Sequence, residues 1–137
     1  MSPKEELVIE WLKLADDDIR MAELTMEDTE PVYWAAAFHA QQAAEKSLKA
    51  FLAYNEYHVE KTHDIEFLVK LCVQFLPEME QFITSGATLS EYAVDSRYPD
   101  MKFEINKIKA EKAVETARSI YEFVLNSLPD LSKPPKE

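Results

Sequence analysis

Residues 38–52 read FHAQQAAEKSLKAFL, and their spacing decides the fold. Small and apolar side chains recur at three- and four-residue steps through this stretch, which is the period of one face of an α-helix. Alanine side chains on such a face let two helices approach closely. The stripe consists of Ala37, Ala40, Ala44, Leu48 and Phe51. We therefore expect a helix from about residue 33 to residue 57 that packs tightly against its neighbours.

The same periodicity continues on both sides of this helix. It predicts further helices over residues 3–28, 62–75, 77–84 and 106–128, with a short helical piece over 88–94. Thr62 is the expected N-cap of the third helix, because acidic residues follow it in the first turn. Gly86 is expected just beyond a helix C-terminus, where a positive φ is required.

Composition supports an all-α fold. The chain has 137 residues, which suits a single domain, and 47% of them are hydrophobic, which suffices for a packed core. It contains one Gly, whereas β-rich folds and phosphate-cradling loops use several. We predict an up-and-down bundle of four to five helices in one domain over residues 1–128, followed by a flexible C-terminal tail over 129–137.

The chain is strongly acidic. Twenty-six Asp and Glu against fifteen Lys and Arg give a net charge of −11. Sequence-independent binding to nucleic acid needs the opposite excess, so the net charge gives no support to an RNA partner. Asp16, Asp17 and Asp18 form the densest acidic cluster, but successive helix positions point about 100° apart, so we expect a solvated face there.

The N-terminal residues and the single cysteine bear on location. The stretch MSPKEELVIE has acidic residues where a secretion signal has basic ones, and no apolar run of about 18 residues occurs in the chain. Cys72 alone permits neither an internal disulfide nor a multi-cysteine metal site, and it stands in an apolar run that suits the core. We expect a cytoplasmic protein with no membrane segment.

One helix face is polar in a way that the bundle itself does not require. His39, Gln42, Glu45, Lys46 and Lys49 share a side of the second helix, opposite the alanine stripe. Two interpretations stay open. The face is either a solvated surface with an i,i+4 ion pair between Glu45 and Lys49, or a binding surface.

Two histidines and one arginine are candidates for chemistry. His39 and His63 could move a proton, but neither has a second histidine at metal-ligand spacing, so we expect no metal and no cofactor. Arg97 stands in a Tyr-Pro loop before the last helix, and its planar fork suits a phosphate or a carboxylate. A structural salt bridge to Asp95 or Asp100 is the equal alternative.

The order of these motifs resembles the HEPN family. The motifs are FHAQQAAEKSLKAFL at 38–52, THDI at 62–65 and SRYPD at 96–100, with Trp11 and the acidic cluster in the opening helix. The resemblance implies a compact helical bundle that is usually a homodimer and often works with a minimal nucleotidyltransferase, in some branches as a toxin–antitoxin module. It also implies that the 96–100 loop, with Arg97 and Tyr98, lies near the polar face of the second helix.

Ribonuclease branches of the family carry an Arg followed by four to six residues and a His. Here Arg97 is present, but Lys102, Phe103 and Glu104 occupy the required places and no His follows His63. The chain thus lacks the expected acid–base group. The resemblance favours a binding module that contacts a partner, a nucleotide or a phosphate. An RNA-cleaving toxin with a substitute base (His63, His39 or Glu104) and a purely structural homodimer are the alternatives.

Overall fold

The computed structural model of the chain describes residues 1–93 and 104–131. Within these residues the secondary structure is helical, which confirms the predicted all-α class. The elements are α1 (Pro3–Glu27), α2 (Tyr33–Tyr54), α3 (Ile65–Val73), the 3₁₀ helix η1 (Pro77–Phe82), α4 (Ile83–Ser90) and α5 (Lys107–Ser127).

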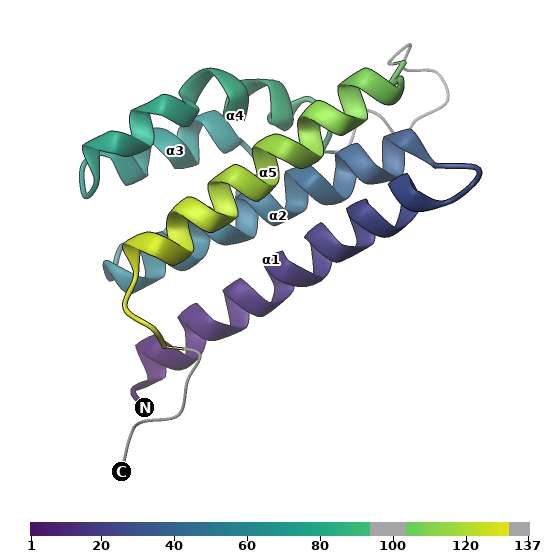
Figure 1. Cartoon of the computed structure of the whole chain (residues 1–137). Coiled ribbons are helices and arrows are strands. Elements are labelled where there is room, and N and C mark those ends of the chain that lie inside the picture. The colour runs from purple at the N-terminus through teal and green to yellow at the C-terminus, as the bar shows by residue number, and fades with distance from the viewer. Residues whose placement is uncertain (94–103, 132–137) are drawn as a thin grey trace.

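Helix α1 begins with a complete capping box. The Ser2 side chain accepts a hydrogen bond from the Glu5 amide, the Glu5 side chain accepts one from the Ser2 amide, and Pro3 occupies the first turn. These contacts satisfy backbone donors that the first turn leaves free. A short turn then reverses the chain, so α2 runs antiparallel to α1 (Figure 1).

Helix α2 is the central element of the bundle. It packs against α1, α3 and α5, and Figure 1 shows it lying between α1 and the other helices. The predicted alanine stripe is in the core, and the burial extends almost around the helix. The residues of α2 that are fully or nearly fully buried are Ala36, Ala37, Ala40, Gln41, Ala43, Ala44, Glu45, Ser47, Leu48, Ala50, Phe51 and Leu52. Because the helix is buried on nearly every side, its polar residues have little contact with solvent.

Residues 55–64 lead the chain back along α2. Glu56 adopts a positive φ of 55° directly after α2, and the carbonyl of His63 accepts a hydrogen bond from the Gln41 amide at 3.1 Å. Helix α3 therefore starts beside the middle of α2 and runs in the same direction, with Cys72 buried near the Leu48 carbonyl. Helix α4 then returns antiparallel to α3, because the Ser90 hydroxyl near its end accepts from the Ile65 amide at 2.7 Å.

The start of the third helix differs from the prediction. Asp64, not Thr62, is the N-cap, and its side chain accepts a hydrogen bond from the Phe67 amide at 3.1 Å. Thr62 lies two residues before this cap, and its hydroxyl accepts a hydrogen bond from the Asp64 amide. Thr and Asp are both good N-caps, so the position of His63 against α2 decides which of the two residues caps the helix.

The prediction for Gly86 was wrong. It lies inside α4 with no positive φ, and the two short pieces predicted over 77–84 and 88–94 are instead η1 followed directly by α4. A Cβ at this position would lie 2.9 Å from Cγ2 of Ile65 and 3.4 Å from Cγ2 of Val69. The glycine is required by the close approach of α4 to α3 rather than by backbone conformation.

Helix α5 completes the bundle. Asn106 caps it by accepting from the Lys109 amide at 2.8 Å, and Arg118 forms ion pairs with Glu23 of α1 and with Glu122 one turn along. None of the helices that the structure describes is long and apolar enough to cross a membrane. The predicted domain boundary at residue 128 and the tail after it stay predictions, because residues 132–137 lie outside the described chain.

Candidate functional site

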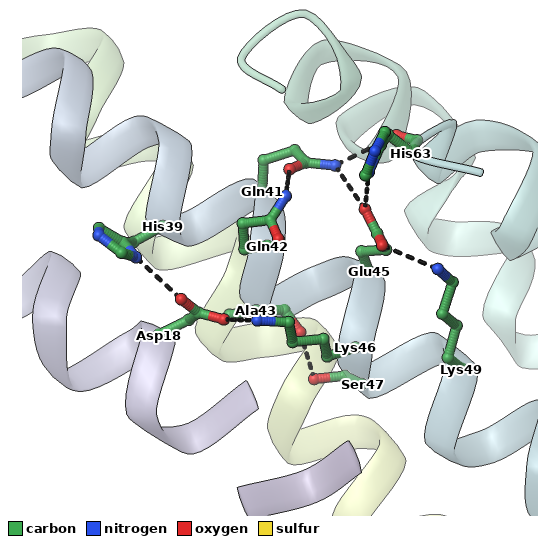
Figure 2. Close-up of polar contacts among 10 residues, drawn as sticks. All are labelled: Asp18, His39, Gln41, Gln42, Ala43, Glu45, Lys46, Ser47, Lys49 and His63. Atoms are coloured by element: carbon green, nitrogen blue, oxygen red, sulfur yellow. Dashed lines mark hydrogen bonds and ion pairs between the residues drawn. The ribbon is translucent and has the colours of Figure 1, made fainter. Parts of the chain in front are cut away.

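We call His39, Gln42, Glu45, Lys46 and Lys49 the α2 polar face. Figure 2 shows that these side chains belong to two networks, one reaching to α1 and the other to the segment before α3. The face is not the solvated surface that one interpretation expected. Glu45 is 4% exposed, and the other four side chains are half-buried.

The first network centres on Asp18 of α1, which is 8% exposed. Nδ1 of His39 lies 2.8 Å from its Oδ1, and Nζ of Lys46 lies 2.6 Å from its Oδ2. An ionised carboxylate can only accept, so Nδ1 of His39 carries the proton in this contact. One buried carboxylate thus joins α1 to two positions of α2.

The second network repeats this arrangement around Glu45. Nδ1 of His63 lies 2.7 Å from Oε1, and Nζ of Lys49 lies 2.8 Å from Oε2, which confirms the predicted i,i+4 pair. Burial alone would raise the pKa of the Glu45 carboxyl, but the hydrogen bonds and charges of Lys49 and His63 outweigh it and lower the pKa below its ordinary value. Glu45 is therefore ionised at neutral pH.

Two glutamines connect the second network to the surface. The Gln41 amide donates to Oε1 of Glu45 at 3.2 Å as well as to the His63 carbonyl. The Gln42 amide donates to Oε1 of Gln41 at 2.7 Å. These bonds fix the loop carrying His63 against α2, and they orient the Glu45 carboxylate.

The arrangement presents two imidazoles of fixed orientation. Within the described part of the chain, Nε2 of His39 and of His63 has no hydrogen-bond partner, and the side chains are 29% and 47% exposed. Lys46 and Lys49 are each neutralised by a buried carboxylate. In this state the face offers oriented polar atoms rather than free positive charge.

A cavity of about 790 Å³ adjoins the second network. Trp11, Ala53 and Tyr57 line it together with Glu45 and Lys49. The Lys49 ammonium lies 5.5 Å from the centre of the Trp11 ring, so the cation is held between an aromatic face and a carboxylate. Concave surfaces that combine an aromatic wall with a few fixed polar groups are typical binding sites.

Comparisons with known proteins agree with this architecture. The family model of the HEPN domain matches residues 8–128. The chain belongs to the HEPN family. The HEPN chain is also similar to a solved crystal structure, that of TT1696 from Thermus thermophilus, with 29% sequence identity and a TM-score of 0.73. That match covers 88% of this chain and 98% of the other. No curated protein matches the sequence significantly.

Some of the predicted site of this HEPN chain lies outside the described residues. Arg97 and Tyr98 fall in the segment 94–103, so their predicted cleft with the α2 polar face stays a prediction. Glu104, one of the substitute bases considered, is exposed, and its carbonyl accepts from the Lys109 ammonium at 3.3 Å. Among the described residues, no group of three or more His, Cys, Asp or Glu side chains is placed to hold a metal ion.

Sequence reasoning missed two members of the networks. The acidic cluster predicts a solvated face for Asp18, but this residue lies on the buried stripe of α1, between Ala15 and Ala22 in helical spacing. Gln41 likewise occupies a core position of α2 and is fully buried. A polar residue at a three- or four-residue step from core alanines was the signal, because such a side chain must find a partner inside the bundle.

Proposed function

We propose that this HEPN chain is a binding module that forms a homodimer and acts with a nucleotidyltransferase partner, which supplies the chemical step. The α2 polar face and the adjoining cavity are its binding surface. A phosphate or nucleotide contact, where one is made, depends on Arg97.

Two buried carboxylates, each shared by one histidine and one lysine, carry this proposal. All four cationic or polar partners are held before anything binds, so little side-chain freedom is lost when a ligand or protein contacts them. Side chains fixed in this way on rigid helices suit recognition.

Exposed apolar side chains support a protein contact at this surface. Leu14 and Met21 lie four residues before and three residues after Asp18, so the three share one side of α1. Both are about half exposed. Apolar side chains beside an ordered polar cluster are typical of an interface core with a polar surround. A contact between two copies about a two-fold axis would cover them.

The sequence after Arg97 supports binding rather than cleavage. Family ribonucleases place a histidine four to six residues after the arginine, and here no histidine follows His63. Lys46 and Lys49 of the α2 polar face are already paired with carboxylates, so Arg97 is the predicted site residue to test for phosphate recognition.

The direct experiment isolates the tagged chain from its own cells and identifies what accompanies it by mass spectrometry. We expect a nucleotidyltransferase in stoichiometric amount. Arg97→Ala should leave the melting temperature unchanged and weaken partner or nucleotide binding by more than about 1.5 kcal/mol. A variant that melts several degrees lower yet binds as well as the parent would place Arg97 in the scaffold and end its assignment to the site.

The geometry of His63 favours one second candidate, an RNA-cleaving toxin. Its Nδ1 is held by Glu45, and its side chain is 47% exposed, as in a histidine poised to move a proton. The assay is cleavage of single-stranded RNA in EDTA. We expect no activity comparable to the family ribonucleases. Efficient cleavage that is lost in both Arg97→Ala and His63→Ala would establish the toxin function instead.

A further inference from the structure

A groove separate from the α2 polar face runs between the N-terminal half of α1 and the C-terminal end of α5. These two helices lie along α2 in opposite directions (Figure 1). The groove has a volume of about 1070 Å³, no residue of the α2 polar face lines it, and among the described lining residues it shares Leu7 alone with the cavity beside that face.

The inner surface of the groove is apolar. Leu12 and Tyr121 are half-buried at its base, and Leu7 and Leu125 line it while remaining 50% and 39% exposed. Leucines this exposed on two neighbouring helices form a surface that another apolar group can cover.

The charge along the groove is predominantly negative. Glu6, Glu10, Asp16 and Asp17 line it, whereas Lys13 and the N-terminal residue Met1 supply the positive charge among its described lining residues. Three of the acids (Glu6, Glu10 and Asp17) are exposed, and none of the three forms an ion pair with a described residue.

One acid of the groove also acts on its half-buried part. Burial and, next, the carboxylate of Asp16 raise the pKa of the Tyr121 hydroxyl, against a smaller opposing effect of Arg118. Asp16 is therefore close enough to Tyr121 to influence the enclosed part of the groove.

We propose that this groove docks a basic amphipathic helix from a partner protein. Glu6 and Asp17 are about three helical turns, or about 16 Å, apart along α1. A partner helix of about three turns would therefore reach both acids. Leucine-type side chains of that helix would cover Leu7 and Leu125, and its lysines or arginines would meet the unpaired acids. A second copy of acidic α1, a nucleic acid or a phosphate ligand would be repelled by the same charges.

The chain's own C-terminal residues are a weaker match. Leu131 lines the groove, but residues 132–137 contain only two lysines and one glutamate. The proposal depends on acidic residues that line neither the α2 polar face nor its cavity, and it defines the partner's chemistry without requiring a nucleotidyltransferase. Its failure would therefore leave the proposed function standing.

The test uses a fluorescent helical peptide of about 14 residues with leucines at helical spacing and lysines elsewhere. Its control is the same peptide with glutamate in place of lysine. Binding to the full chain is followed by fluorescence anisotropy, and the contacted residues are mapped by amide chemical shifts. The variant Glu10→Gln/Asp17→Asn removes two groove charges, and Glu78→Gln/Glu80→Gln removes two exposed charges on η1.

We expect the lysine peptide to bind and the glutamate peptide not to bind, with shifts concentrated at Tyr121 and Leu125. The groove variant should bind about fivefold or more weakly and the η1 variant within about twofold of the parent. Equal losses in both variants, no loss in the groove variant, or no binding of the lysine peptide would overturn the proposal. A chain ending at Leu131 that binds about tenfold more tightly would show that the tail is the occupant, and would also overturn it.

Discussion

Asp18 and Glu45 are nearly excluded from water, and a carboxylate in that position is stable only when its charge is matched and its oxygens are hydrogen-bonded. Each meets that requirement with one lysine and one histidine. The two sets have different tasks in the fold. Asp18 joins α1 to α2, whereas Glu45 holds the loop that carries His63.

Asp18→Asn should destabilise the chain by about 1–2 kcal/mol, because Lys46 and His39 then lose a shared anion in a half-buried position. Urea unfolding followed by circular dichroism gives the free energy of unfolding. Asp17→Asn is the matched control, since Asp17 is its exposed neighbour. Equal effects in the two variants would show that the Asp18 network contributes nothing specific.

Glu45 should make stability depend on acid pH. Its pKa in the folded chain is below the ordinary value of 4.5, so the unfolded chain takes up the proton first. The stabilisation by ionised Glu45 is complete when the pH is above the ordinary pKa, and it is lost as the pH falls through the lowered pKa of the folded chain. Urea unfolding of the parent and of Glu45→Gln between pH 7 and pH 3 gives the free energy of unfolding of each. The difference between these two free energies should shrink on acidification. A difference that grows instead would contradict the ion pairing.

The helix boundaries that depend on local sequence were predicted well, and those that depend on contacts with distant residues were not. The bounds of α1, α2 and α5 follow from periodicity and caps, and the predicted ranges agree with them to within a few residues. The start of α3 could not be predicted, because it depends on the loop before it returning along α2 and anchoring through His63. The role of Gly86 also depends on a neighbouring helix.

The same kind of contact limited the prediction of the site. The spacing along α2 placed His39, Gln42, Glu45, Lys46 and Lys49 on one side, but their partners Asp18 and His63 come from other elements. A one-dimensional pattern shows which residues share a face, and it does not show what is packed against that face.

Helix α4 provides a test of close packing. Gly86→Ala should destabilise the chain by about 1–2 kcal/mol, because the added Cβ meets the stiff, buried Ile65 side chain and the misfit exceeds the helix-propensity gain of alanine. Thr88→Ala, on the exposed side of α4, should change stability by less than about 0.5 kcal/mol. Thermal melts of both variants decide the point, and a more stable Gly86→Ala chain would rule out the tight α3–α4 contact.

At the scale of the whole molecule, the described surface includes two regions of different chemistry. The α2 polar face is balanced in charge when Asp18 is included, with exposed Leu14 and Met21 beside it, whereas the α1–α5 groove is acidic. Surfaces that differ in this way can engage different partners without competing. We propose that the α2 polar face contacts a second copy and the nucleotidyltransferase, and that the groove binds a basic helix.

The mass of the purified chain in solution tests the central claim, a dimeric binding module, most directly. One chain has a mass of 15.8 kDa, and light scattering at tens of micromolar should give twice that value. Leu14→Glu/Met21→Glu should reduce the measured mass to that of one chain while the helical circular dichroism is retained, because the added charges oppose burial at a contact between two copies. A parent mass of 15.8 kDa at every concentration would contradict the account.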